Sequence, residues 1–294
     1  MKILFTTDWH LNSQKPALRI DEDYITTQVK KVKEVFDIAK EEKVDMILHG
    51  GDMFDKAKTP HLIINQITPL FKENNTIFYI TLGSHDVVGY NLNELDYTGL
   101  GNFIRNGHIK ILNEESFAHG IHCKTSLQIP QGYENTILVM HETVSPIPQP
   151  FDYVSLEQIA NLNKNVTVFS GHLHKQFYEE IKGSRFYNPG PLVRTDIGEI
   201  LIKPAVVIYD TVSQVGKFRY LTSAKDGKEV FAYTKAAEIK QKEQEFQNFI
   251  DSIHQSFQDV DIEKTLLKLA KEKNIEQSVI DRCLILLRSV ECPT

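Results

Sequence analysis

The 294-residue sequence has few cysteines, no excess of positive charge and no long apolar run. Its three cysteines form no C-x-x-C pair, which argues against a cysteine metal site or a disulfide framework. The formal net charge is −6, so global charge does not indicate a basic nucleic-acid binder, although a local patch or a partner can supply positive potential. The apolar start is too short for a signal peptide, and no segment is apolar enough to span a bilayer. We therefore expect a soluble, cytoplasmic protein without a membrane segment.

The sequence does contain five apolar runs that end in aspartate, histidine or glycine. The run at 44–48 leads into Gly50-Gly51-Asp52, where the glycines let the backbone come close to a ligand. The other four endings are Asp8-Trp9-His10, Gly83-Ser84-His85-Asp86, His141 and Gly171-His172-Leu173-His174. Ligands of open α/β sheets bind at the carboxyl ends of the strands. These endings therefore mark one candidate functional edge.

The order of the expected elements indicates an α/β fold. A buried strand at 3–7, an amphipathic helix at 22–43 and a strand at 44–48 form a βαβ unit, which favours a sheet that is parallel at its centre. Thr59-Pro60 is typical of a helix start, with Thr59 as N-cap. Further strands are expected at 76–82, 109–112, 116–123, 136–140, 166–170, 205–209 and 217–221.

The sequence changes in character at about residue 226. No glycine occurs from Thr234 onward, and two apolar stripes at helical spacing predict helices. We expect two domains, residues 1–225 and a small C-terminal helical appendage at 226–294. The stripes either pack on the core and on each other, or bind a partner or a second copy. The tail has 10 Lys and Arg against 13 Asp and Glu, so it is not a basic DNA-binding arm.

The five strand endings carry the ligand types that a pair of divalent metals needs. Carboxylate and imidazole together suit Mn, Fe and Zn, whereas oxygen ligands alone suit Mg and Ca. A bridging carboxylate can hold two ions about 3.5–4 Å apart, and water acidified by metal can then act as the nucleophile. A lone Asp-x-His or strand-end histidine is usually structural. All five endings in this order favour a metal site.

In this order the motifs D-x-H, G-D, G-x-H-D, H and G-H-x-H resemble those of the calcineurin-like metallophosphoesterases. The resemblance covers roughly residues 1–222. Thr7-Asp8-Trp9-His10-Leu11, Gly51-Asp52-Met53-Phe54-Asp55 and the stretch 187–194 are similar to the SbcD-type double-strand-break-repair nucleases of bacteria, phages and archaea. The resemblance implies a four-layer metallophosphoesterase β-sandwich flanked by helices. It also implies a two-metal-dependent DNA exonuclease and endonuclease of DNA repair or phage DNA metabolism.

The resemblance also implies a role for each residue at the strand ends. The implied ligands of two divalent metals, for which Mn²⁺ is expected, are Asp8, His10 and His174 for one ion, His141 and His172 for the other, and Asp52 for both. His85 would stabilise the transition state and help protonate the leaving 3′-oxygen. Asp86 would orient His85 through a hydrogen bond, or would instead cap the turn.

One position departs from the pattern of the family, which has asparagine before the catalytic histidine. Ser84 stands there in this chain. Its hydroxyl is shorter and a poorer ligand for the second metal, which weakens that site. We therefore expect activity with Mn²⁺ at high concentration and poor activity with Mg²⁺.

A nuclease holds the phosphate backbone, usually with lysine and arginine. The candidates are Lys15, Arg19, Lys56, Lys58 and Arg194, each of which can also be a solvated surface charge. The resemblance further implies DNA as substrate, a homodimer and an SMC-like ATPase partner of the SbcC type. Two alternatives stay open: a phosphodiesterase or phosphatase of the same superfamily with a small or protein substrate, and a catalytically weakened dimeric scaffold for the ATPase.

Overall fold

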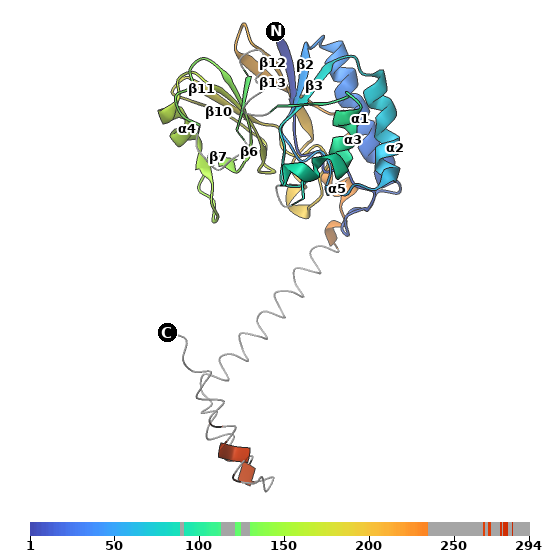
Figure 1. Cartoon of the computed structure of the whole chain (residues 1–294), viewed down its shortest axis with the longest axis vertical. Coiled ribbons are helices and arrows are strands. Elements are labelled where there is room, and N and C mark those ends of the chain that lie inside the picture. Colours follow the sequence, from blue (N-terminus) through green and yellow to red (C-terminus); the bar gives the residue numbers. More distant parts are fainter. Residues whose placement is uncertain are drawn as a thin grey trace. The chain divides into compact units, whose positions relative to one another are not determined.

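The computed structural model describes residues 1–88, 91–112 and 130–234, the backbone of 121–124, and a few positions between 267 and 284. The chain divides into two units, Met1–Tyr233 and Thr234–Thr294 (Figure 1). Nearly all of the second unit lies outside the described residues, and so do all members of the two predicted apolar stripes except Val279. Within the described residues, no helix combines the length and the apolar character needed to cross a membrane.

The first unit contains a six-stranded sheet with a parallel centre. Its strands in spatial order are β13 (Val215–Tyr220), β12 (Ala205–Asp210), β1 (Lys2–Thr6), β2 (Met46–His49), β3 (Ile77–Ile80) and β4 (Lys110–Ile111). Strands β1 to β4 run parallel, and Ile3 of β1 pairs with Met46 of β2. β12 and β13 extend the sheet in antiparallel pairing. The prediction of a parallel centre is confirmed.

A second, five-stranded sheet packs against the first. Its spatial order is β10 (Phe177–Ile181), β11 (Ser184–Asn188), β9 (Thr167–His172), β6 (Ile137–Glu142) and β5 (Ile121–Lys124). β5, β6, β9 and β11 run parallel, and β10 is antiparallel. β7 (Val144–Ser145) and β8 (Val154–Ser155) form a small separate pair. The predicted strand at 116–123 lies partly outside the described residues.

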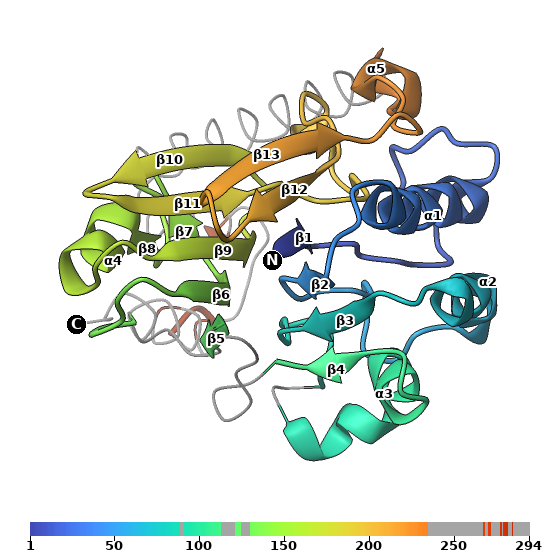
Figure 2. The ribbon, with the colours of Figure 1, turned by 90° about the horizontal axis from the view of Figure 1, so that it is seen from above.

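Helices cover the outer faces of both sheets, which gives four layers (Figure 2). The helices of the first sheet are α1 (Tyr24–Glu41), α2 (His61–Glu73) and α3 (Gly99–Arg105), and α4 (Leu156–Leu162) covers the second sheet. The short α5 (Gly227–Val230) closes the first unit. Asp23 caps α1 by accepting from Thr26 N at 2.9 Å. α2 begins one residue later than expected, with Pro60 rather than Thr59 at its N-cap. The predicted α/β sandwich flanked by helices is confirmed.

The burial of β1 explains why its three central residues, Ile3, Leu4 and Phe5, are all apolar rather than alternating with polar residues. Ile3 and Phe5 point into the core between the two sheets, whereas Leu4 points into the core under the helices. All three side chains are fully buried. Each such side chain stabilises the fold by roughly 1.5–3 kcal/mol relative to exposure. Packing on both faces therefore fixes β1 in place, and Asp8 follows two residues after its end.

Candidate metal centre

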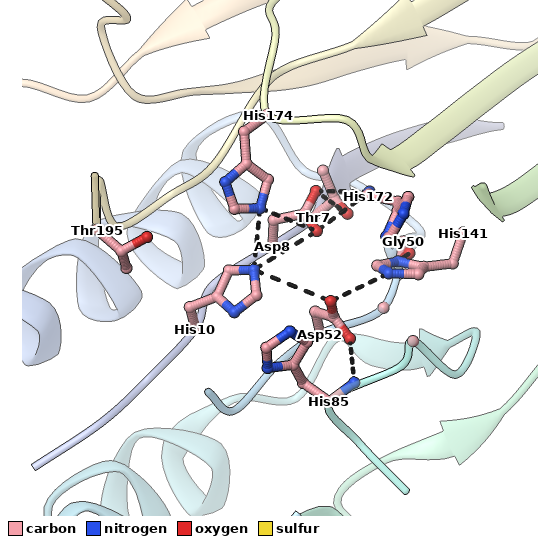
Figure 3. A network of polar contacts seen from close by, with 12 residues as sticks. Thr7, Asp8, His10, Gly50, Asp52, His85, His141, His172, His174 and Thr195 are labelled. Carbon is pink, nitrogen blue, oxygen red and sulfur yellow. Dashed lines mark hydrogen bonds and ion pairs between the residues drawn. The ribbon is translucent and has the colours of Figure 1, made fainter. Parts of the chain in front are cut away.

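The candidate ligands come together where the carboxyl ends of the two sheets meet. Asp8 and Asp52 follow β1 and β2 of the first sheet, while His141 and His172 lie in the last two residues of β6 and β9 of the second. Backbone and side chain join the edges directly: His172 N donates to both Asp8 oxygens at 3.1–3.2 Å. Figure 3 shows Asp52 between the His10 ring and the His141 ring.

The side chains form two compact groups of possible ligand atoms. In each group the ligand atoms lie within 4.8 Å of one another, and the groups are Asp8–His10–His174 and Asp52–His141–His172. A third group, His10–Asp52–His85, overlaps both. These groups contain the six Asp and His residues that the sequence indicated as ligands. That they bind metal stays a prediction.

Two close contacts bring possible ligand atoms of different residues together. His10 Nε2 lies 3.0 Å from His174 Nε2. His141 Nε2 lies 3.1 Å from Asp52 Oδ2, but it lacks hydrogen-bond geometry and any other partner among the described atoms. His10 Nε2 lies 3.9 Å from Asp52 Oδ2, so Asp52 reaches towards both groups. The Asp52 carboxylate therefore lies within reach of both groups, and its bridging of two ions stays a prediction.

The outer ring nitrogens of two histidines fix which nitrogen faces the centre. His174 Nδ1 lies 2.5 Å from Glu199 Oε1, and His141 Nδ1 lies 2.7 Å from Gly50 O. Each Nδ1 therefore donates a proton to its acceptor, so Nε2 is the ring atom that faces the cluster and would bind a metal once its own proton is lost. Metal-binding histidines use this arrangement, in which an acceptor outside the site orients the ring. Donor set and orientation thus fit two divalent ions.

Burial and neighbouring charges shift the pKa values of the cluster in opposite directions. Burial would lower the pKa of His141, but the Asp52 and Asp8 carboxylates raise it to about 9. Burial, together with His174, lowers the pKa of His10 to about 3. Burial also raises the pKa of Asp8. Perturbed pKa values of opposite sense in one cleft indicate a functional site.

Four of the site residues have a backbone conformation that L-residues rarely adopt. Their φ angles are 49° at Asp8, 44° at His10, 54° at Asp52 and 73° at His172. Left-handed non-glycine residues cost roughly 1–3 kcal/mol each and cluster at functional sites. The strain here aims the ligands away from the strand directions and into the space between the sheets.

Two glycines of the motifs allow the loops to approach each other. Gly51 has φ of 100°, and a Cβ there would lie 2.5 Å from His141 Nδ1. A Cβ on Gly83 would lie 2.1 Å from Asp52 Oδ1. Side chains at either position would push the histidine and the aspartate out of the centre.

His85 lies at the exposed rim of the centre, but Asp86 does not orient it as expected. His85 Nδ1 bonds to the Asp55 carbonyl oxygen at 2.6 Å, and its ring contacts the His10 ring. The buried Asp86 carboxylate instead accepts from the backbone N–H groups of Gly83, Asp52 and Met53 at 2.8–3.1 Å. The alternative of a capping carboxylate is therefore the correct one. Asp86 ties the loop after β3 to the loop after β2.

The arginines expected to contact DNA are buried, so that expectation is wrong for both. Arg19 donates to the Asp21 carboxylate at 2.7 and 2.9 Å and to the Arg194 carbonyl oxygen at 2.8 Å. Arg194 is 2% exposed and donates to the carbonyl oxygens of Ile202 and Lys225. Most of their donors are used inside the fold, where they brace the loop after β11. The other three candidates, Lys15, Lys56 and Lys58, are exposed, and Ser84 is partly buried beside Gly83.

A comparison with known families decides the classification. The model of the calcineurin-like phosphoesterase family matches residues 1–184. The chain belongs to this family. The predicted superfamily is thereby confirmed, and with it the general character of a metal-dependent phosphoester hydrolase.

Curated relatives of this phosphoesterase carry a more specific name. The DNA double-strand break repair protein Mre11 of Methanocaldococcus jannaschii is 26% identical over 213 residues, which are 66% of this chain and 53% of that protein. The Mre11 protein of Methanococcus maripaludis is 25% identical over 175 residues, which are 50% and 45%. The chain thus spans about half the length of these two relatives. A solved archaeal phosphodiesterase, 17% identical, superposes with a TM-score of 0.42 over 75% of this chain and all of its own.

Sequence reasoning missed two residues that orient the site of this phosphoesterase. Glu199 is buried and holds His174, and the Asp55 carbonyl oxygen holds His85. The motif Asp196-x-x-Glu199 is a capping box at the 3₁₀ turn Ile197–Glu199, and it could have located the turn. No pattern in the sequence connects that turn with His174, because the contact depends on packing between loops 25 residues apart.

Proposed function

We propose that this phosphoesterase is a two-metal-dependent DNA nuclease. It would hydrolyse phosphodiester bonds as an exonuclease and endonuclease in DNA repair or phage DNA metabolism, with Mn²⁺ as the metal. The observation that carries the proposal is the pair of Asp and His groups on either side of Asp52, with His85 at the exposed rim. The Mre11 names of two partial relatives support DNA as the substrate.

The site residues have three proposed roles: some bind the metals, one fixes the loops and one transfers a proton. We assign the ligands as Asp8, His10 and His174 for one ion, His141 and His172 for the other, and Asp52 for both. Ser84 is assigned to the second ion because it stands directly before His85 in the sequence. Two bound divalent ions would polarise the phosphate and acidify a water towards neutral pH. Asp86 holds the two loops that carry Asp52 and His85 at a fixed separation.

We assign His85 as the general acid that protonates the leaving 3′-oxygen. Its Nδ1 must donate, because the Asp55 carbonyl oxygen can only accept. Nε2 is therefore the ring atom that can take up a proton and pass it on. His85 is exposed, so a phosphodiester can reach it from solvent.

The remaining assignments concern partners. We propose that residues 226–294 form a cap or partner-binding region that supports a homodimer and an SMC-like ATPase of the SbcC type. An ATPase with its own DNA-binding surface would supply the positive potential that the net charge of −6 lacks.

The proposal is tested by cleavage of a labelled hairpin and of a blunt duplex with Mn²⁺. Wild type is compared with His85→Ala and with His61→Ala, an exposed histidine at the start of α2 that serves as the matched control. General acid catalysis contributes about 10²–10⁴-fold, so we expect that loss in His85→Ala and none in His61→Ala. Hydrolysis of bis(p-nitrophenyl) phosphate without DNA cleavage would reject the nuclease and favour a small-substrate phosphodiesterase. Inertness towards both would favour the scaffold.

A further inference from the structure

A cavity of about 300 Å³ lies beside the metal centre, on the side of His10. Its lining residues come from the loop after β1, the start of α1, the loop after β2 and the loop before the 3₁₀ turn; they are His10, Asn12, Lys15, Tyr24, Lys56 and Thr195 among others. Figure 3 shows Thr195 on the same side of the cluster as His10. The cavity therefore adjoins the centre.

The charge of the cavity is suited to an anion. Lys15 and Lys56 enter the lining from two different loops, and both are exposed. The one carboxylate in the lining, Asp55, already accepts from Asn12 Nδ2 at 2.8 Å and lies 3.8 Å from His10 Nδ1. Its charge is thus directed to groups of the wall. Lys15 Nζ donates to Asp21 O at 2.7 Å, which uses one of its three N–H groups and leaves two for a ligand.

One polar group in the lining has no function in the fold. Tyr24 is 5% exposed, and its hydroxyl has no hydrogen-bond partner among the described residues. A buried hydroxyl without a partner costs about 1–3 kcal/mol. Its ring packs near the Arg19 guanidinium, so the ring has a structural role that the hydroxyl does not share. The hydroxyl is therefore an unused hydrogen-bond donor in the wall of the cavity.

The wall that holds these groups is rigid. Gln28 of α1 is fully buried and binds both the N–H and the carbonyl oxygen of Asn12, at 2.9 and 2.8 Å. This pair of bonds fixes the loop between Asp8 and Lys15 against α1. A ligand would therefore meet a formed site rather than order a mobile loop.

We infer that this pocket, formed by Lys15, Lys56 and the Tyr24 hydroxyl, is a subsite for a second phosphate of the substrate. This phosphate would belong to the nucleotide next to the phosphodiester held at the metal centre. The inference rests on the proposed function and narrows it, because a substrate with a single phosphate gains nothing from the subsite. The pocket would select nucleic-acid strands over small phosphodiesters.

The test is calorimetric binding to the full chain in EDTA, which prevents metal-dependent hydrolysis. The probes are the thymidine dinucleotide TpT, its 5′-phosphorylated form pTpT, its 3′-phosphorylated form TpTp, and inorganic phosphate. Because a hydrogen bond to a charged group contributes about 1.5–3 kcal/mol, we expect one phosphorylated dinucleotide to bind about tenfold or more tightly than TpT. Inorganic phosphate alone should bind no better than TpT; preferential binding of free phosphate would assign the pocket to product instead of strand.

Substitutions in the pocket test whether the gain in affinity over TpT arises there. Lys15→Ala, Lys56→Ala and Tyr24→Phe should each remove most of the gain, whereas Lys30→Ala, an exposed lysine of α1 outside the pocket, should keep it. Tyr24→Phe should leave the free energy of unfolding unchanged or higher, because no bond is lost. A structural role for the hydroxyl would lower it.

The inference is overturned if neither phosphorylated dinucleotide binds better than TpT, or if the gain survives in both lysine variants. Failure of the proposed nuclease would appear differently, as an absence of hydrolysis with Mn²⁺ while the binding preference in EDTA persists.

Discussion

Removing the charge of Glu199 should weaken one metal site and leave the other unchanged. Glu199 Oε1 accepts from His174 Nδ1 at 2.5 Å, while Oε2 accepts from Thr195 N and Asp196 N at 2.6 and 3.2 Å. Glu199→Gln supplies only one acceptor oxygen, and its NH₂ group must face a donor on the other side. If the oxygen stays with the backbone, His174 Nδ1 loses its acceptor, and the ring proton can move to Nε2, where it blocks the ligand position.

The size of the effect follows from the general behaviour of residues that orient metal ligands. Loss of such a partner typically costs 10- to 100-fold in metal affinity, or about 1.4–2.7 kcal/mol. The second group, Asp52–His141–His172, makes no contact with Glu199 in the described structure, so its affinity should change little. The variant should therefore separate two binding steps.

The assay is titration of the metal-free chain with Mn²⁺ in a calorimeter. Wild type is compared with Glu199→Gln and with Glu179→Gln, an exposed glutamate of β10 that undergoes the same change in charge. We expect one step to weaken 10- to 100-fold only in Glu199→Gln. Equal isotherms for all three proteins would refute the role of Glu199, and equal weakening of both steps would refute the separation of the sites.

Three further predictions address the second metal, acid stability and the tail. Ser84→Asn supplies an amide oxygen, so it should tighten the weaker Mn²⁺ step and raise activity with Mg²⁺; unchanged calorimetric binding would count against this. Burial lowers the pKa of His49 from 6.5 to about 3, so the unfolded chain binds the extra proton below pH 6.5 and stability is lost as pH falls. Between pH 6.5 and 4.5 the free energy of unfolding should fall by about 2–3 kcal/mol, as measured by urea denaturation in the presence of EDTA. His49→Asn keeps an acceptor for Gly51 N and should remove most of this loss of stability. An unchanged pH dependence in the variant would exclude His49 as the cause. A chain that ends after Thr234 should keep phosphodiesterase activity and lose binding to an ATPase partner; unfolding of that chain would instead mean that the tail packs on the core.

The positions of the strands and of the Asp and His cluster could be predicted because short-range signals determine them. Residues 3–5 and 46–48 are consecutive apolar residues because both faces of their strands are covered, and such runs are recognisable in sequence. Parallel strands then bring their carboxyl ends to one edge, which places Asp8 beside Asp52 without knowledge of any side chain.

Contacts between loops could not be predicted, because they depend on packing across the whole unit. Arg19 and Arg194 were expected at the surface, where most arginines lie. In the structure they donate to the backbone carbonyl oxygens of Arg194, Ile202 and Lys225, which lie outside the strands and helices. The same holds for Asp86, whose sequence neighbour His85 suggested a bond that the turn geometry gives to backbone N–H groups instead.

The most direct test of the two-metal centre is the Mn²⁺ stoichiometry of the full chain, measured by equilibrium dialysis for wild type and Asp52→Asn. Asp52 Oδ2 lies near both groups, at 3.1 Å from His141 Nε2 and 3.9 Å from His10 Nε2. The account predicts two ions per wild-type chain at saturation, and at most one in the variant at the same free Mn²⁺. One ion in wild type, or two in both proteins at equal affinity, would contradict a centre bridged by Asp52.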